Sequence, residues 1–126
     1  MTRTVVATDK APKTPAVYSQ AITAAGLVFV SGTMPYDATT NTVVGSTIQE
    51  QTAQCLRNIS AILEAAGTSL SRAVSATIIL VDGADFAGMN EEWLQWFQVD
   101  PPARQASQLP IRPLGVKISI AMIAEA

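Results

Sequence analysis

Residues 46–67 read STIQEQTAQCLRNISAILEAAG and predict a long amphipathic helix. Ser46 with Gln49 three residues later resembles a capping box at its start, and Gly67 is a typical residue to end it. The residues that recur at three- and four-residue spacing, and so share one face, are Ile48, Thr52, Cys55, Ile59, Ile62 and Ala66. Because this face is mostly apolar, we expect it to pack on a core that the rest of the chain supplies.

Strand patterns lie on both sides of this helix. The expected strands are Thr4–Ala7, Val17–Thr23 and Leu27–Ser31 before it, and Ala73–Val81, Ala103–Leu109 and Val116–Ala124 after it. A second helix is expected from Asp85 to Phe97. The β-branched run of Ala73–Val81 is typical of a strand buried on both faces, whereas Val116–Ala124 alternates along its length. The order β-β-β-α-β-α-β-β predicts an α+β fold, with one mixed sheet and both helices on one face.

Composition limits the class of protein. The chain has 126 residues, of which 48% are hydrophobic and only 14% charged, against a norm of roughly 25% charged. No linker or shift in composition divides it, so we expect a single domain over residues 1–126. A lightly charged small domain cannot easily cover itself with polar groups, and this favours an oligomer with buried apolar faces.

Several functional classes are excluded by residues that are missing. The sequence has no histidine and one cysteine, so it holds no Ser-His-Asp or Cys-His nucleophile and no usual zinc site. Its eight lysines and arginines are scattered, which disfavours binding to nucleic acid. No apolar run approaches the roughly 18 residues that span a bilayer, and the start does not read as a signal peptide. We therefore expect a cytoplasmic protein without membrane contact.

A few polar residues stand in unusual places. Arg104 follows a rigid Pro-Pro turn and enters a strand of neutral residues, where its planar guanidinium could bind a carboxylate through two hydrogen bonds. The alternative is a surface arginine paired with an aspartate or glutamate. Tyr18 could equally pack on the core, and Asn90 could simply be solvated. Ser31-Gly32 at a strand end could offer a backbone N–H to an anion or form a plain turn.

Local patterns along the whole chain resemble one family in their order and spacing. They are Ala11-Pro12, Tyr18-Ser19-Gln20, Leu27–Ser31-Gly32, Asn58-Ile59, Leu63–Gly67, Asp85-Phe86-Ala87, Met89-Asn90, Pro102-Ala103-Arg104, and Val116-Lys117-Ile118 followed by Ala124. Together they resemble the reactive intermediate/imine deaminase family, called RidA or YjgF and often labelled L-PSP endoribonuclease.

The resemblance implies a fold, an assembly and a reaction. The fold would be the chorismate-mutase-like α+β domain, and three copies would form a homotrimer with clefts between subunits. Members hydrolyse small 2-imino or enamine carboxylates to 2-oxo acids and ammonia, without a cofactor or a metal. Arg104 would bind the substrate carboxylate and Tyr18 would be the tyrosine of the cleft. Ser31, Gly32 and Asn90 would also line it.

Three positions depart from the family pattern. The last strand reads Lys117-Ile118-Ser119-Ile120, so Ser119 stands where many deaminating members carry a glutamate that positions water. A serine can bind water but cannot act as a carboxylate base. Ala106 replaces a cysteine, and Ala16-Val17 replaces Gly-Pro before the tyrosine. We still place Ser119 among the catalytic positions and Ala106 among the substrate-binding ones, and we expect slow or absent turnover of 2-iminopropanoate and 2-iminobutanoate.

Four functions remain open from the sequence. The first is a cofactor-independent imine deaminase. The second is a divergent enzyme of a specialised pathway that takes a larger or more apolar substrate, in a pocket widened at Ser119 and Ala106 and shaped by Trp93 and Trp96. The third is a trimer that binds a carboxylate ligand without turnover. Ribonuclease activity is weaker, because the sequence shows no basic track or aromatic platform for RNA.

Overall fold

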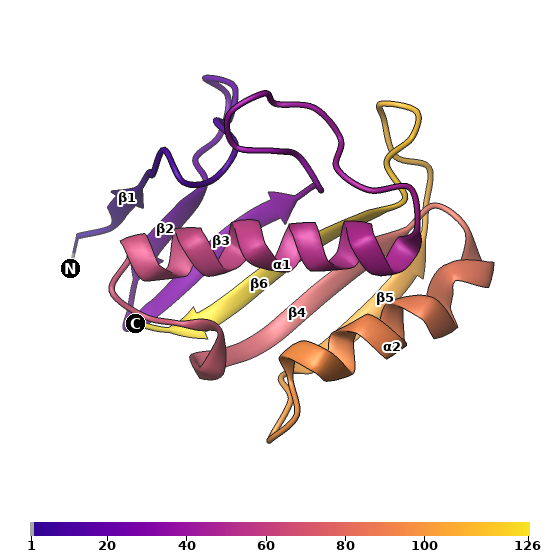
Figure 1. Ribbon diagram of the computed structural model, residues 1–126. Helices are drawn as coiled ribbons and strands as arrows, with labels where there is room; N and C mark the ends of the chain where they lie inside the picture. The colour runs from indigo at the N-terminus through magenta and orange to yellow at the C-terminus, as the bar shows by residue number, and fades with distance from the viewer. Residues whose placement is uncertain (1) are drawn as a thin grey trace.

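The computed structural model describes residues 2–126 and is built around one β-sheet. Its strands are β1 (Thr4–Val6), β2 (Ala21–Ala24), β3 (Leu27–Thr33), β4 (Ala73–Leu80), β5 (Ala103–Gln108) and β6 (Ile118–Glu125). The helices are α1 (Ile48–Ala65) and α2 (Phe86–Trp96), with short 3₁₀ turns at Leu70–Arg72 and Gly83–Asp85. Figure 1 shows both helices on one face of the sheet. The predicted α+β fold, with one mixed sheet and both helices on one face, is confirmed.

The strand order is β1-β2-β3-β6-β4-β5, so the last strand of the chain lies at the centre of the sheet. β6 pairs antiparallel with both β3 and β4, whereas β4 and β5 run parallel. A parallel pair needs a crossover connection, and α2 supplies it. β5 thereby becomes an edge strand beside α2 (Figure 1). Arg104 is the second residue of β5.

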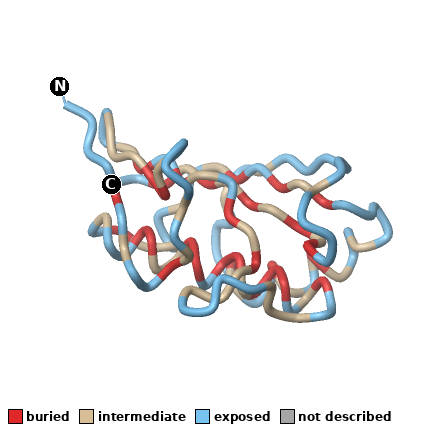
Figure 2. Tube along the Cα trace, turned by 90° about the horizontal axis from the view of Figure 1, so that it is seen from above, coloured by how far each residue is buried: buried red, intermediate tan, exposed pale blue. Residues whose placement is uncertain are grey.

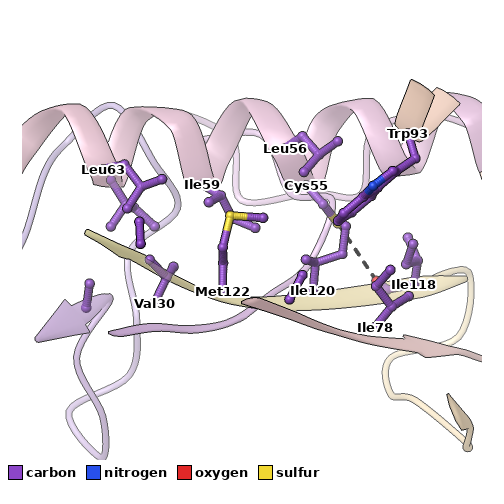
Figure 3. Packing of buried hydrophobic residues seen from close by; sticks show 14 of the residues in the cluster. Val30, Cys55, Leu56, Ile59, Leu63, Ile78, Trp93, Ile118, Ile120 and Met122 are labelled. Carbon is purple, nitrogen blue, oxygen red and sulfur yellow. Dashed lines mark hydrogen bonds between the residues drawn. The ribbon is translucent and has the colours of Figure 1, made fainter. Parts of the chain in front are cut away.

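The core lies between the sheet and the helices. On β6, Ile118, Ile120 and Met122 are buried and point toward Cys55, Leu56, Ile59 and Leu63 of α1, as Figure 3 shows. The predicted apolar face of α1 is therefore confirmed, and Cys55 is a core residue. Burial raises the pKa of its thiol well above the ordinary value, so Cys55 stays protonated and unreactive.

The other face of the sheet is open, and Glu125 is the one charged residue that β3, β4, β5 and β6 place on it. The residues of these four strands on this face are Leu27, Phe29, Ser75, Thr77, Ile79, Ala103, Gln105, Ser107, Ser119, Ala121, Ile123 and Glu125. None of these is classed as buried, and Phe29 is 41% exposed. Figure 2 shows buried segments in both the sheet and the helix layers, and exposed ones mainly in loops. The expectation that Ala73–Val81 is buried on both faces is wrong for the single chain.

The start of α1 is displaced by one residue from the predicted capping box. Thr47, not Ser46, is the N-cap, and its hydroxyl accepts a hydrogen bond from the Glu50 backbone N–H at 3.1 Å. The Glu50 carboxylate in turn accepts the backbone N–H groups of Ser46 and Thr47, each at 3.1 Å. These bonds lower the pKa of Glu50. The Glu50 carboxylate accepts two N–H groups better than the amide of Gln49 would. The helix therefore begins with Thr47 as its N-cap and not with Ser46.

Two strands are shorter than predicted because side chains bind the backbone there. Residues 17–20 were expected to begin a strand, but β2 starts only at Ala21. The amide of Gln20 bonds to Thr8, Ala11 and Pro12 along the preceding loop, and this holds the segment as a loop. Similarly, Lys117 donates its backbone N–H to Gln51 at 2.8 Å, and β6 starts at Ile118.

No helix described in residues 2–126 is long and apolar enough to cross a membrane.

The cap assignment makes a testable distinction between neighbouring residues. Thr47→Ala removes the hydroxyl that satisfies a free N–H at the helix start, so it should lower the free energy of unfolding by about 1 kcal/mol. Ser46→Ala is the matched control, because its hydroxyl reaches only Glu50 at 3.4 Å, and it should change stability by a few tenths at most. Chemical denaturation of both variants measures this. A larger loss in Ser46→Ala would contradict the assignment.

Candidate functional site

Arg104 lies where β5 meets α2, at one edge of the helix-covered face. Arg104 pairs with Ala76 of β4, and Ala76 pairs with Met122 of β6. The three side chains therefore lie on the same face of the sheet, which is the face that packs into the core. One guanidinium nitrogen donates a hydrogen bond to Oδ1 of Asn90, and another lies 3.6 Å from the sulfur of Met89. Arg104 and Asn90, both candidate site residues, are therefore in contact within one chain.

Two aromatic rings lie close to the same guanidinium. Its central carbon lies 5.7 Å from the Phe86 ring centre and 5.3 Å from the Trp93 ring centre. Partial burial lowers the pKa of Arg104, but an arginine remains charged at neutral pH. Among residues 2–126, the single ion pair joins Arg72 and Glu125, at 3.9 Å. Arg104 is thus a positioned cation with no acidic partner in the described chain, and the alternative of a paired surface arginine does not apply.

A second group of predicted residues lies at the far end of β3. The register of β3 against β6 shifts between Val30 and Thr33, so Ser31 and Gly32 form an irregularity in the strand. The Ser31 hydroxyl donates to the Ser19 carbonyl at 2.6 Å, and its backbone N–H donates to the Gln20 carbonyl at 3.0 Å. The backbone N–H of Ser31 is thus already bonded, and an anion-binding role for Ser31-Gly32 stays a prediction.

Ser119 belongs with this second group. An added Cβ at Gly32 would lie 3.2 Å from Oγ of Ser119, which places the serine directly against the Gly32 backbone. Ser119 pairs with Ile79, and Ile79 with Ser107, so the side chain of Ser119 is on the open face. Arg104 is on the helix-covered face, along with Ala106. One chain therefore does not present Arg104 and Ser119 to the same side of the sheet.

A cavity of about 520 Å³ opens beside Tyr18, Ser31 and Gly32. It lies among the loop before β2, the end of β3, the loop that precedes α1 and the loop that precedes β6. Its lining residues are Pro12, Lys13, Thr14, Pro15, Tyr18, Gln20, Ser31, Gly32, Thr33, Met34, Tyr36, Asn41, Thr42, Val43, Ile62 and Pro113. Tyr18 is 45% exposed and is not a core residue. Arg104, Asn90, Ala106 and Ser119 do not line this cavity.

The residues that sequence reasoning missed here are Tyr36 and Lys13. Tyr36 shares the cavity with Tyr18, and burial together with the nearby Tyr18 raises the pKa of its phenol. An aromatic residue between Pro35 and Asp37 in a loop was the available signal. The tryptophans expected to shape a wider pocket do not line the cavity. Trp93 is buried and stacks on Phe97, while Trp96 donates to Glu92 at 2.8 Å.

The carboxylates and the cysteine of the described residues do not gather into a cluster that could hold a metal. No group of three or more histidine, cysteine, aspartate or glutamate side chains in residues 2–126 is arranged to hold a metal ion. The Asp37 carboxylate accepts the backbone N–H groups of Thr39 and Thr40, at 2.8 and 2.9 Å, so it closes its own turn. The group around Arg104 therefore offers an oriented cation at one edge of the sheet. The group around Ser31 offers hydroxyls at the end of β3, where the cavity opens.

Sequence comparison places this chain in a family. The family model described as Endoribonuclease L-PSP matches residues 8–126. The chain is 44% identical to a RutC family protein of Pyrococcus horikoshii over 120 residues, which are 95% of each chain. The chain belongs to the RidA/YjgF family. It is also 36% identical, over 98% of this chain and 90% of the other, to a goat protein named 2-iminobutanoate/2-iminopropanoate deaminase.

Comparison with a solved structure leads to the same family on the basis of the fold. The crystal structure of E. coli TdcF with bound serine superposes with a TM-score of 0.90 at 32% identity, covering 98% of both chains. The RidA/YjgF fold predicted from sequence is therefore confirmed for this chain. The bound serine is a property of that protein, and the roles of Arg104, Tyr18, Ser31, Gly32, Asn90, Ala106 and Ser119 in this one remain predictions.

Proposed function

We propose that this RidA/YjgF protein binds small 2-imino carboxylates and hydrolyses them to 2-oxo acids and ammonia. The observation that carries the proposal is Arg104, a cation oriented by Asn90 and two aromatic rings and without an acidic partner in residues 2–126. A guanidinium in this state is suited to a carboxylate ligand. The relative named as an imine deaminase and the serine bound to TdcF, itself a small carboxylate, support the same substrate class.

The proposed reaction needs little acid–base machinery. Water adds through its oxygen to the imine carbon, and the carbon–nitrogen double bond becomes a single bond as its electron pair takes a proton at nitrogen. The resulting carbinolamine loses ammonia and forms the 2-oxo acid. Because the imine is already electrophilic, orienting substrate and water contributes most of the effect. Tyr18 is the candidate hydrogen-bond donor to the substrate nitrogen, and Ser119 the candidate to orient water.

A second function is favoured by Ser119 itself. The residue lies against Gly32 and brings no carboxylate to accept the proton of the attacking water. The cation at Arg104 is unaffected by this difference. A protein that binds carboxylates at Arg104 and turns imines over slowly, or not at all, is therefore the alternative.

The separation of the two groups supports a proposed homotrimer. β3 and β5 are three strand positions apart, which is roughly 14 Å at 4.8 Å per strand, and Arg104 and Ser119 are on opposite faces. A second copy can bring its Arg104 edge to the Tyr18 and Ser31 end of the first. The open face, where Glu125 at the end of β6 is the one charged residue of the four strands, supplies a surface that copies of the chain can bury together.

The assembly is checked by mass in solution. We expect size-exclusion chromatography with light scattering to give three times the mass of one chain. Phe29→Glu places a charge on the apolar β3 side of the open face, and it should dissociate the assembly. Recovery of the wild-type chain as a monomer would contradict the proposed trimer and the site shared between subunits.

The role of Arg104 is checked by replacement. Arg104→Ala should weaken carboxylate binding, or lower activity, by about 2–5 kcal/mol, which is typical when one partner of a desolvated charge pair is removed. Arg104→Lys should recover only part, because an ammonium cannot form the two-pronged contact. Arg72→Ala is the matched control, since that arginine is exposed and pairs with Glu125. Unchanged binding in a folded Arg104→Ala would reject the role.

The role of Ser119 is checked by restoring the carboxylate. Under the proposed function, wild-type protein should hydrolyse freshly generated 2-iminopropanoate and 2-iminobutanoate slowly, and under the carboxylate-binding alternative not at all, measured as ammonia release. Ser119→Glu should raise that rate if water positioning is the missing function, and Ser119→Gln, of the same size without the charge, should not. Fast turnover by the wild type would show that Ser119 suffices. No gain in Ser119→Glu would favour the carboxylate-binding alternative.

A further inference from the structure

The cavity beside Tyr18 is larger than a three-carbon imino acid requires. Its volume of about 520 Å³ falls within the roughly 300–1,000 Å³ of sites that enclose drug-sized ligands. Ser31 and Gly32 are among its lining residues, so the cavity adjoins the residues proposed to meet the substrate. A substrate held there has room for a bulky substituent on its second carbon.

The walls of this cavity are mainly apolar and include two aromatic rings. Tyr18 and Tyr36 both line it, together with prolines 12, 15 and 113 and the side chain of Ile62. Aromatic rings prefer such surroundings because they bury a large apolar area and pack edge-to-face or offset against other rings. The shape and chemistry therefore suit a planar apolar group.

The backbone of Tyr36 is held in place by polar side chains of α1. Its backbone carbonyl accepts hydrogen bonds from Nδ2 of Asn58 at 2.9 Å and Nε2 of Gln54 at 3.1 Å. Its backbone N–H donates to Met34 at 2.9 Å. Asn58 is 2% exposed, so this anchor is shielded from water. The ring is thus attached to a fixed backbone, although it lies in a loop.

The charge that lines the cavity is positive only. Lys13 is the single charged residue among those that line it, and no acidic side chain does. The raised pKa of Tyr36 keeps its phenol protonated at neutral pH, so the second ring adds no negative charge. These surroundings accept an anionic ligand and disfavour a cationic substituent.

We propose that this cavity is a side-chain subsite for aromatic 2-imino carboxylates, and that Tyr36 is the residue that selects the aromatic ring. The inference rests on the proposed function, because it assumes that the substrate carries a 2-imino carboxylate. It assigns to the chain a substrate class of the 2-imino-3-phenylpropanoate type, in preference to 2-iminopropanoate. Tyr18 forms the opposite wall, and the reacting carbon remains near Ser31 and Gly32.

Binding of stable product acids tests the subsite without relying on turnover. Isothermal titration calorimetry with phenylpyruvate and pyruvate should show at least about tenfold tighter binding of phenylpyruvate to the wild-type protein. Tyr36→Ala should remove most of this preference and leave pyruvate binding unchanged. Leu94→Ala, an exposed apolar residue of α2 outside the cavity, is the matched control and should keep the preference. Thr42→Trp fills the cavity from its rim and should exclude phenylpyruvate but not pyruvate, even if Tyr36→Ala does not fold.

The outcomes separate the subsite from the proposed reaction. Equal binding of the two acids, or a preference that survives both cavity variants, overturns the subsite. Tighter binding of 2-oxoglutarate than of phenylpyruvate also overturns it, in favour of an acidic substituent near Lys13. Ammonia release from the imines of alanine and phenylalanine is then measured in parallel. A preference that depends on Tyr36 with no hydrolysis of either imine upholds the subsite and rejects the proposed deaminase.

Discussion

The alternation of β6 is the constraint on which the rest of the structure depends. Ile118, Ile120 and Met122 are buried beneath α1, and the residues between them face the opposite way. Because successive residues of a strand point to opposite faces, this single pattern fixes which side receives the helices and which side stays open. A slip of one residue would bury Ser119 and expose the isoleucines. The position of the candidate catalytic serine is thus a consequence of core packing.

The same two-sidedness explains why the candidate site is divided. Arg104 continues a core row on the helix-covered side and is clamped by α2, whereas Ser119 lies on the open side against Gly32. Neither position can change sides without disrupting the core. A chain built in this way holds the parts of a site but does not join them, and this is the physical basis for proposing that a second copy completes it.

Much of the fold could be predicted from sequence, and the failures have local causes. The order of strands and helices was predicted because periodicity in α1 and β6 is strong. The N-cap was misplaced because Ser46 and Thr47 are both good caps, and only the reach of Glu50 decides between them. The segment before β2 was misassigned because the Gln20 amide binds the loop backbone, an interaction across eight to twelve residues that propensity does not reveal.

The candidate site was less predictable than the fold. The resemblance to RidA/YjgF pointed to Arg104 and Asn90, and the structure brings these two together. Their separation from Ser119 depends on the register of β5, β4 and β6, which are distant in sequence, so no local pattern encodes it. Tyr36 was missed for a related reason. Its place in the cavity is set by Asn58 and Gln54, two polar residues that occupy the loop-facing side of an otherwise ordinary amphipathic helix.

The central place of β6 has a consequence for synthesis of the protein. During translation β3 and β4 are made long before β6, and the strand that must lie between them emerges last. Until then each presents an unpaired backbone edge, and α1 has only part of the surface that it covers. The nascent chain therefore cannot close its sheet step by step as it leaves the ribosome. Closure depends on contacts between residues far apart in sequence, which form slowly and leave strand edges open to other chains in the meantime.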